Sequence, residues 1–178
     1  RCPLPYQSSM IDDCIAKGKA LQEGGAHYNF SGPQGFGIAN MTDALYAIKK
    51  LVYEDKKVTI EEMKEALDYN YGQGFGTTKA QEVTGEIAKQ LMAAGRSVGA
   101  EEIAMIYKQV IADSKNHPKK ARFAEIRALI DTVAKYGNDN EEVDLFARDV
   151  AYTYTKPLLG YMNPRGGIFQ AGLYPVSA

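Results

Sequence analysis

The spacing of apolar residues indicates helices along most of the chain. The first helix is predicted to start at the capping residues Ser8 and Ser9, to carry apolar residues at helical spacing, and to end at the glycine pair Gly24 and Gly25. The apolar positions expected on its buried face are Ile11, Cys14 and Ile15. A short extended piece over residues 27–30 should follow, and then a glycine-rich loop.

A second helix is expected after this loop, with Asn40 or Thr42 as its N-cap and a buried face that carries Leu45, Ile48, Leu51 and Val52. Thr59 and Glu62 have the Thr-x-x-Glu spacing of a capping box, which predicts the start of a third helix. The ranges expected for this and the later helices are Thr59 to about Asn70, Lys79 to Ala94, Ala100 to Asp113, Pro118 to Ala134, and Glu141 to Tyr161, with Pro157 ending or kinking the last one.

Strands are few in this pattern. The closing run "GIFQAGLYPVSA" is predicted to be an apolar strand, and only one or two other strands are expected. A strand of this kind requires neighbours in a sheet. The sequence therefore predicts a mostly helical segment of a larger α/β protein, whose remaining strands would come from residues outside this chain.

Composition and charge exclude several classes of protein. The formal net charge of -1 gives no general attraction to nucleic acid or to an anionic membrane. No apolar run has the length of a bilayer span. Two cysteines, Cys2 and Cys14, are too few for a disulfide scaffold, so a reducing, cytoplasmic location is expected.

Two glycine-rich loops could carry function. Gly32-x-x-Gly35-x-Gly37 leads into a helix N-terminus, where free N–H groups favour an anion, but it has the spacing of neither common nucleotide-binding motif. The alternative is that its glycines adopt positive φ angles and allow a tight entry to the helix. The similar run over residues 72–76 is expected to be a flexible loop followed by capping threonines, Thr77 and Thr78.

Other reactive side chains favour structural roles. His27 and His117 have no acidic or cysteine partner at ligand spacing, so no metal site is predicted. His27 is interpreted as a structural histidine and His117 as a solvated one. Cys14 is expected to be a buried thiol rather than a nucleophile. Three of the four acidic pairs, which begin at Glu61, Glu101 and Glu141, occupy first helical turns, where negative charge offsets the helix dipole.

Several phrases of the sequence together resemble one family. These are "LPYQSSMIDDCIAKGKALQEGGAHYNFSGPQGFGIANMTDALYAIKKLVYEDKKVTIEEMKEAL", "KYGNDNEEVD" and "NPRGGIFQAGLYPVSA", in that order. The chain is similar over essentially its whole length to glycyl radical enzymes of the pyruvate formate-lyase superfamily. The resemblance is weakest between Asn70 and Arg122. It implies a ten-stranded α/β barrel that encloses a cysteine loop and a loop whose glycine stores a radical.

The resemblance also implies which catalytic groups the chain lacks. Neither Cys2 nor Cys14 has the Gly-Cys-Val-Glu context, and no radical-glycine motif is present. Residues 1–178 would thus be an internal segment between the cysteine loop and the glycyl radical domain, with no catalytic residue and no cofactor of its own. The substrate pocket is expected to be lined by Tyr174 and Val176, which share a strand face, and by Gln34 and Phe36.

For the parent enzyme, the resemblance implies radical cleavage of a C–X bond in a small polar substrate under anaerobic conditions. Within the superfamily the closing segment looks most like choline trimethylamine-lyases, with isethionate, diol and hydroxyproline enzymes as alternatives. The implied partners are the rest of the parent chain, an activating enzyme with S-adenosylmethionine and an iron–sulfur cluster, and a second copy in a homodimer. A bacterial microcompartment is a possible cytoplasmic location. A non-enzymatic helical module that binds an anion remains the alternative from another class.

Overall fold

The computed structural model describes residues 4–174, and it divides the chain into two compact units. One unit combines the residues up to Ala44 with those from Ala134 onward, and the other spans Leu45–Val133. The predicted strand residues 175–178, Val176 among them, lie outside the described residues, as does Cys2.

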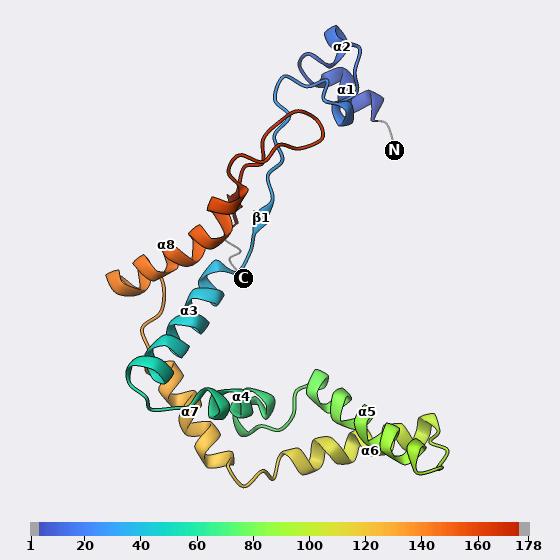
Figure 1. Ribbon diagram of the computed structural model, residues 1–178, viewed down its shortest axis with the longest axis vertical. Coiled ribbons are helices and arrows are strands. Elements are labelled where there is room, and N and C mark those ends of the chain that lie inside the picture. The colour runs from blue at the N-terminus through green and yellow to red at the C-terminus, as the bar shows by residue number, and fades with distance from the viewer. Residues whose placement is uncertain (1–3, 175–178) are drawn as a thin grey trace. The chain divides into compact units, whose positions relative to one another are not determined.

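The first unit contains most of the extended chain. Its elements are α1 (Pro5–Met10), α2 (Cys14–Lys17), a 3-10 turn (Leu21–Glu23), β1 (Gln34–Gly35), the start of α3 (Ile38–Ile48), α8 (Glu141–Thr155), a 3-10 turn (Lys156–Leu158) and β2 (Gly172–Leu173). The segments that carry β1 and β2 run side by side (Figure 1), joined also by a bridge between Ser31 and Phe169. Together they form a short parallel sheet from two distant parts of the sequence.

The predicted first helix is wrong in its extent. Ser8 and Ser9 lie inside α1 rather than at its cap, and their hydroxyls donate to the carbonyl oxygens of Leu4 and Tyr6. The chain leaves α1 at Ile11, whose backbone is extended, and Asp13, with a left-handed φ of 71°, comes directly before α2. Cys14 is buried as expected, but Ile15 is 74% exposed.

The second unit is helical. Its elements are the end of α3, a π-helical turn (Lys49–Glu54), α4 (Ile60–Asp68), a 3-10 turn (Asn70–Gly72), α5 (Thr77–Ala93), α6 (Ala100–Ser114) and α7 (Lys120–Thr132). Helices α5 and α6 pack side by side, as do α4 and α7 (Figure 1). The buried side chains of Leu51, Met63, Phe123 and Ile126 form the core of this unit.

Two of the helix starts after α3 agree with the sequence pattern, and a third does not. The capping box at Thr59 and Glu62 is confirmed, because each residue bonds the other's backbone N–H. The predicted start of α8 at Glu141 is confirmed, and Asn140 is its N-cap, with Oδ1 accepting from the N–H of Val143. The threonine caps predicted for α5 are wrong, since Gly76 is the N-cap and Thr77 is already helical.

The start of α3 also differs from the prediction. This helix begins at Ile38, so Asn40 and Thr42 lie within it, and the Thr42 hydroxyl bonds the carbonyl oxygen of Ile38. Leu51 is buried as expected, but Leu45 is 40% exposed. The buried face is turned toward Tyr46 and Ala47 instead.

Candidate substrate-binding face

The short parallel sheet brings three of the four predicted pocket residues together. Gln34 lies opposite Gly172, and Gly35 lies opposite Leu173. Two backbone hydrogen bonds fix this register, from the N–H of Gly172 to the oxygen of Pro33 and from the N–H of Tyr174 to the oxygen of Gly35. Gln34 and Tyr174 are therefore held near each other although they lie near opposite ends of the chain.

The two faces of this sheet have different surroundings. Gly35 faces α8, where a Cβ on Gly35 would lie 2.8 Å from the Tyr154 ring, and Leu173 contacts the same position. Because side chains alternate along a strand, Gln34, Phe36 and Tyr174 lie on the opposite face. The rings of Phe36 and Tyr174 meet there with their centroids 5.2 Å apart. These two rings are 61% and 57% exposed, so this face is open to a ligand or to other chain segments.

The "NPRGG" turn, which precedes the β2 segment, is hydrogen-bonded to the residues before β1. Asn163 is buried, and its Nδ2 donates to the carbonyl oxygen of Asn29 and to Oγ of Ser31. Its Oδ1 accepts from the N–H groups of Arg165 and Gly167. The sequence predicts a turn for this run, but the pattern does not identify Asn163 as a structural anchor. The signal available was the Asn-Pro-Arg-Gly-Gly turn composition itself.

Of the three glycines in the first glycine loop, one adopts the expected positive φ angle and two do not. Only Gly37, just before α3, has a positive φ, of 75°. Gly32 and Gly35 lie outside the left-handed region. At Gly35 the missing side chain makes space for Tyr154, so the explanation by positive φ is wrong for this residue.

His27 forms part of a small ionic group with α2. Its Nδ1 lies 3.1 Å from Oδ2 of Asp13, and Nζ of Lys17 lies 3.0 Å from the same oxygen. Hydrogen bonds from Lys17 and then from His27 lower the pKa of Asp13. This arrangement agrees with the structural role predicted for His27.

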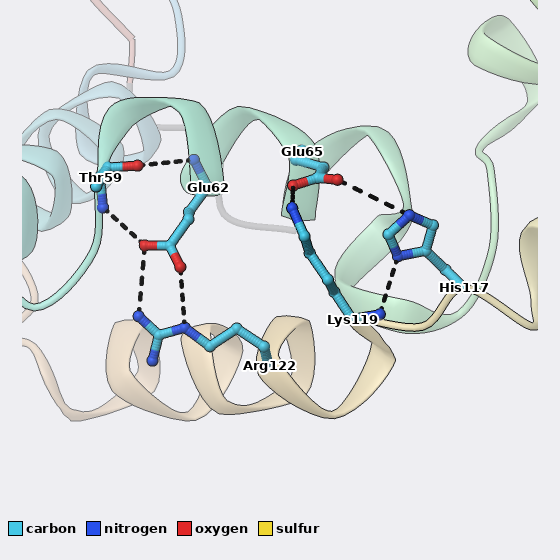
Figure 2. A network of polar contacts seen from close by, with 6 residues as sticks. All are labelled: Thr59, Glu62, Glu65, His117, Lys119 and Arg122. Atoms are coloured by element: carbon cyan, nitrogen blue, oxygen red, sulfur yellow. Dashed lines mark hydrogen bonds and ion pairs between the residues drawn. The ribbon is translucent and has the colours of Figure 1, made fainter.

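His117 is not solvated, contrary to prediction. Its ring lies against Tyr69 and Phe123, with centroids 4.1 and 5.0 Å away. Its Nδ1 accepts from the N–H of Lys119, and its Nε2 lies 3.8 Å from Oε1 of Glu65 (Figure 2). The ring is thus packed between α4 and the start of α7, where it supports the fold of the helical unit.

The remaining candidates are a metal site and the thiol of Cys14. Within residues 4–174, no three His, Cys, Asp or Glu side chains are arranged to hold a metal ion. Cys14 is only 3% exposed, in keeping with a structural thiol.

No membrane-spanning helix is found among residues 4–174, because every helix there is too short or too polar to cross a bilayer.

Comparison with known proteins decides the family. A model of the "Pyruvate formate lyase-like" family matches residues 1–178. The chain belongs to this family. It is 30% identical over 99% of its length to the (2S)-3-sulfopropanediol dehydratase of Klebsiella oxytoca, of which it covers 16%. The family resemblance stated from the sequence is thereby confirmed.

Two solved structures of this pyruvate formate lyase-like kind resemble the chain in fold as well. The first describes 1,2-propanediol dehydration in Roseburia inulinivorans, with 52% identity and a TM-score of 0.83 over 99% of this chain and 21% of that one. The second is the glycerol-bound B12-independent glycerol dehydratase of Clostridium butyricum, with 39% identity and a TM-score of 0.62 over 98% of this chain and 16% of that one. The chain therefore spans about a fifth or less of these relatives. They do not support the expected likeness to choline trimethylamine-lyase.

Proposed function

We propose that this chain is a segment of a glycyl radical dehydratase that removes water from a small uncharged diol. The observation that carries the proposal is the 52% identity, over nearly the whole chain, to the protein of the 1,2-propanediol dehydration structure. By their names, two further relatives act on three-carbon polyols, which are glycerol and a sulfopropanediol whose sulfonate group is anionic, and glycerol is the uncharged one of the two. A diol substrate, one of the alternatives from the sequence, is therefore favoured over choline.

In this proposal the chain supplies part of the wall of a barrel, not its reactive groups. Cys14 does not fit the role of a hydrogen-abstracting thiol, because it is 3% exposed and lacks the Gly-Cys-Val-Glu context. The proposed cysteine and radical glycine therefore belong to other parts of the parent protein. The glycyl radical, installed by a partner activase, would pass its unpaired electron to the sulfur of the proposed cysteine, and that sulfur radical would abstract hydrogen from the substrate.

The residues of this chain would bind and orient the substrate. Gln34, Phe36, Tyr174 and, outside the described residues, Val176 are the proposed lining. Aromatic rings beside a small substrate exclude water, and a carboxamide can hydrogen-bond a hydroxyl without adding charge. A homodimer, a cytoplasmic location and enclosure in a microcompartment accompany the proposal as predictions.

The test is an anaerobic assay of the full-length protein after treatment with its activating enzyme. Electron paramagnetic resonance measures the glycyl radical, and propane-1,2-diol, glycerol and choline are compared by kcat/KM. We expect propanal from propane-1,2-diol with the highest kcat/KM and no trimethylamine from choline. An activated protein that cleaves choline and leaves both polyols intact would contradict the proposal.

A further inference from the structure

The carboxamide of Gln34 is held in one orientation on the open face of the sheet. Its Nε2 donates to the carbonyl oxygen of Gly32 at 3.1 Å. Because a carbonyl oxygen can only accept, this bond fixes which end of the amide is the nitrogen. The oxygen Oε1 points away from that bond, and no residue in the described range 4–174 is recorded as its donor.

Gly172 of β2 lies directly beneath this amide. A Cβ at Gly172 would lie 2.6 Å from Oε1 and 2.9 Å from Nε2 of Gln34. The φ angle of Gly172 is outside the left-handed region, so the backbone does not require glycine there. A Cβ at this position would instead displace the amide of Gln34, which is the far end of a flexible, exposed side chain.

The open face of the sheet also carries two aromatic rings. Phe36 and Tyr174 lie on the same face as Gln34, and their ring centroids are 5.2 Å apart. Gly32 precedes β1, and a Cβ there would meet the Gln34 amide only at an ordinary contact distance. A hydrogen-bond acceptor on the same face as two aromatic rings suits a small, uncharged molecule that carries a hydroxyl group.

We propose that Oε1 of Gln34 accepts a hydrogen bond from a substrate hydroxyl, and that Gly172 is the positioning residue that keeps the amide in place for it. This inference rests on the proposed diol dehydratase function and adds the specific group that recognises the diol. An alanine at position 172 would displace the amide, and would thereby have the same effect on the substrate as removal of the amide itself.

A double-mutant cycle in the activated full-length protein tests this coupling. The variants are Gln34→Ala, Gly172→Ala and the double variant, with Gln90→Ala, an exposed glutamine on α5, as the control. Radical content by electron paramagnetic resonance, and kcat and KM for propane-1,2-diol, are measured for each. Loss of one neutral hydrogen bond should raise KM about 3- to 10-fold in either single variant, with radical content and the control unchanged.

The double variant separates positioning from general damage. Once the amide is absent, a methyl group at position 172 displaces nothing, so the double variant should match Gln34→Ala. If the increases in KM of the two single variants add in the double variant, or if Gln34→Ala leaves KM unchanged, the inference is overturned. The proposed diol dehydratase function still holds in that case, provided that the activated wild type turns over the diol. No turnover of the diol by activated wild type overturns both. Should Gly172→Ala fail to fold, Gln34→Ala alone still decides the role of the amide.

Discussion

Gly35 of β1 lies in direct contact with the ring of Tyr154 on α8. A Cβ at this glycine would be 2.8 Å from Cε1 and 3.0 Å from Cδ1 of the tyrosine. The strand can approach the helix this closely only because it has no side chain here. The contact holds one face of the sheet against α8 and leaves Gln34 and Phe36 on the other.

Gly35→Ala should therefore destabilise the sheet by overpacking. We expect a loss of about 1–3 kcal/mol, measured by hydrogen exchange of the β1 and β2 amides. The matched control is Gly85→Ala inside α5, where a Cβ meets nothing within 4 Å. This control should gain about 0.5–1 kcal/mol in its own helix. Equal behaviour of the two variants would contradict the close contact at Gly35.

The sequence predicted helix starts correctly where the capping residue and its partner lie within one helical turn of each other. The Thr59–Glu62 box and the Asn140 cap each need only residues three positions apart, so their pattern is visible in the chain. The break between α1 and α2 was not predictable in this way. The chain turns extended at Ile11 and left-handed at Asp13, and the Asp13 carboxylate pairs with His27, which lies 14 residues away in the sequence.

The candidate site could be predicted only in part for the same reason. The family resemblance pointed to Gln34, Phe36 and Tyr174, and the structure brings them together. Periodicity could not reveal the pairing of Gln34 with Gly172, because parallel strands are joined through long connections. A side chain at position 35 would meet the Tyr154 ring, and one at position 172 would displace the Gln34 amide, and no local pattern contains either contact.

Asn163→Ala should loosen the junction between the "NPRGG" turn and the residues before β1. The substitution removes four hydrogen bonds and leaves the N–H groups of Arg165 and Gly167 without their acceptor. A loss of about 2–3 kcal/mol is expected in hydrogen exchange of this turn.

The variant Asn163→Asp keeps the volume and the Oδ1 acceptor but loses both bonds donated by Nδ2, and it places a carboxylate oxygen against the carbonyl oxygen of Asn29. Hydrogen exchange of the turn should therefore be faster than in the wild type, although the side-chain volume is unchanged. The exposed Asn116→Ala serves as control and should have no effect on this turn. If Asn163→Asp exchanges hydrogen in this turn at the wild-type rate, the stability of the turn depends on side-chain volume alone.

Glu62 should make the stability of α4 depend on pH. A hydrogen bond from the backbone of Thr59, and then one from Arg122, lower the pKa of Glu62 below its ordinary value of 4.5 (Figure 2). A lowered folded pKa stabilises the protein above the unfolded value, and this contribution is lost as pH falls through the folded pKa. The Glu62 side chain is 34% exposed, so solvent screening limits the contribution to about 0.2–1 kcal/mol.

The substitution Glu62→Gln tests this, because glutamine can still accept from the Thr59 N–H but has no charge. The α4 amides of the variant should exchange faster than those of the wild type at pH 7, and this difference should shrink as the pH falls below the ordinary glutamate pKa of 4.5, when each pair is compared at equal pH. A difference that does not shrink as the pH falls would assign the effect to the hydrogen bond rather than to the charge.

Tyr154→Phe should leave stability unchanged or raise it by up to about 1 kcal/mol. The Tyr154 hydroxyl oxygen is buried, and the structure records no hydrogen-bond partner for it among residues 4–174. Removing an unsatisfied buried hydroxyl relieves its desolvation cost, while the phenylalanine ring keeps the contact with Gly35. Tyr152→Phe, at a ring that is 42% exposed, provides the control. Hydrogen exchange of α8 measures both variants, and a loss above 1 kcal/mol in Tyr154→Phe alone would mean that a group outside the described residues bonds this hydroxyl.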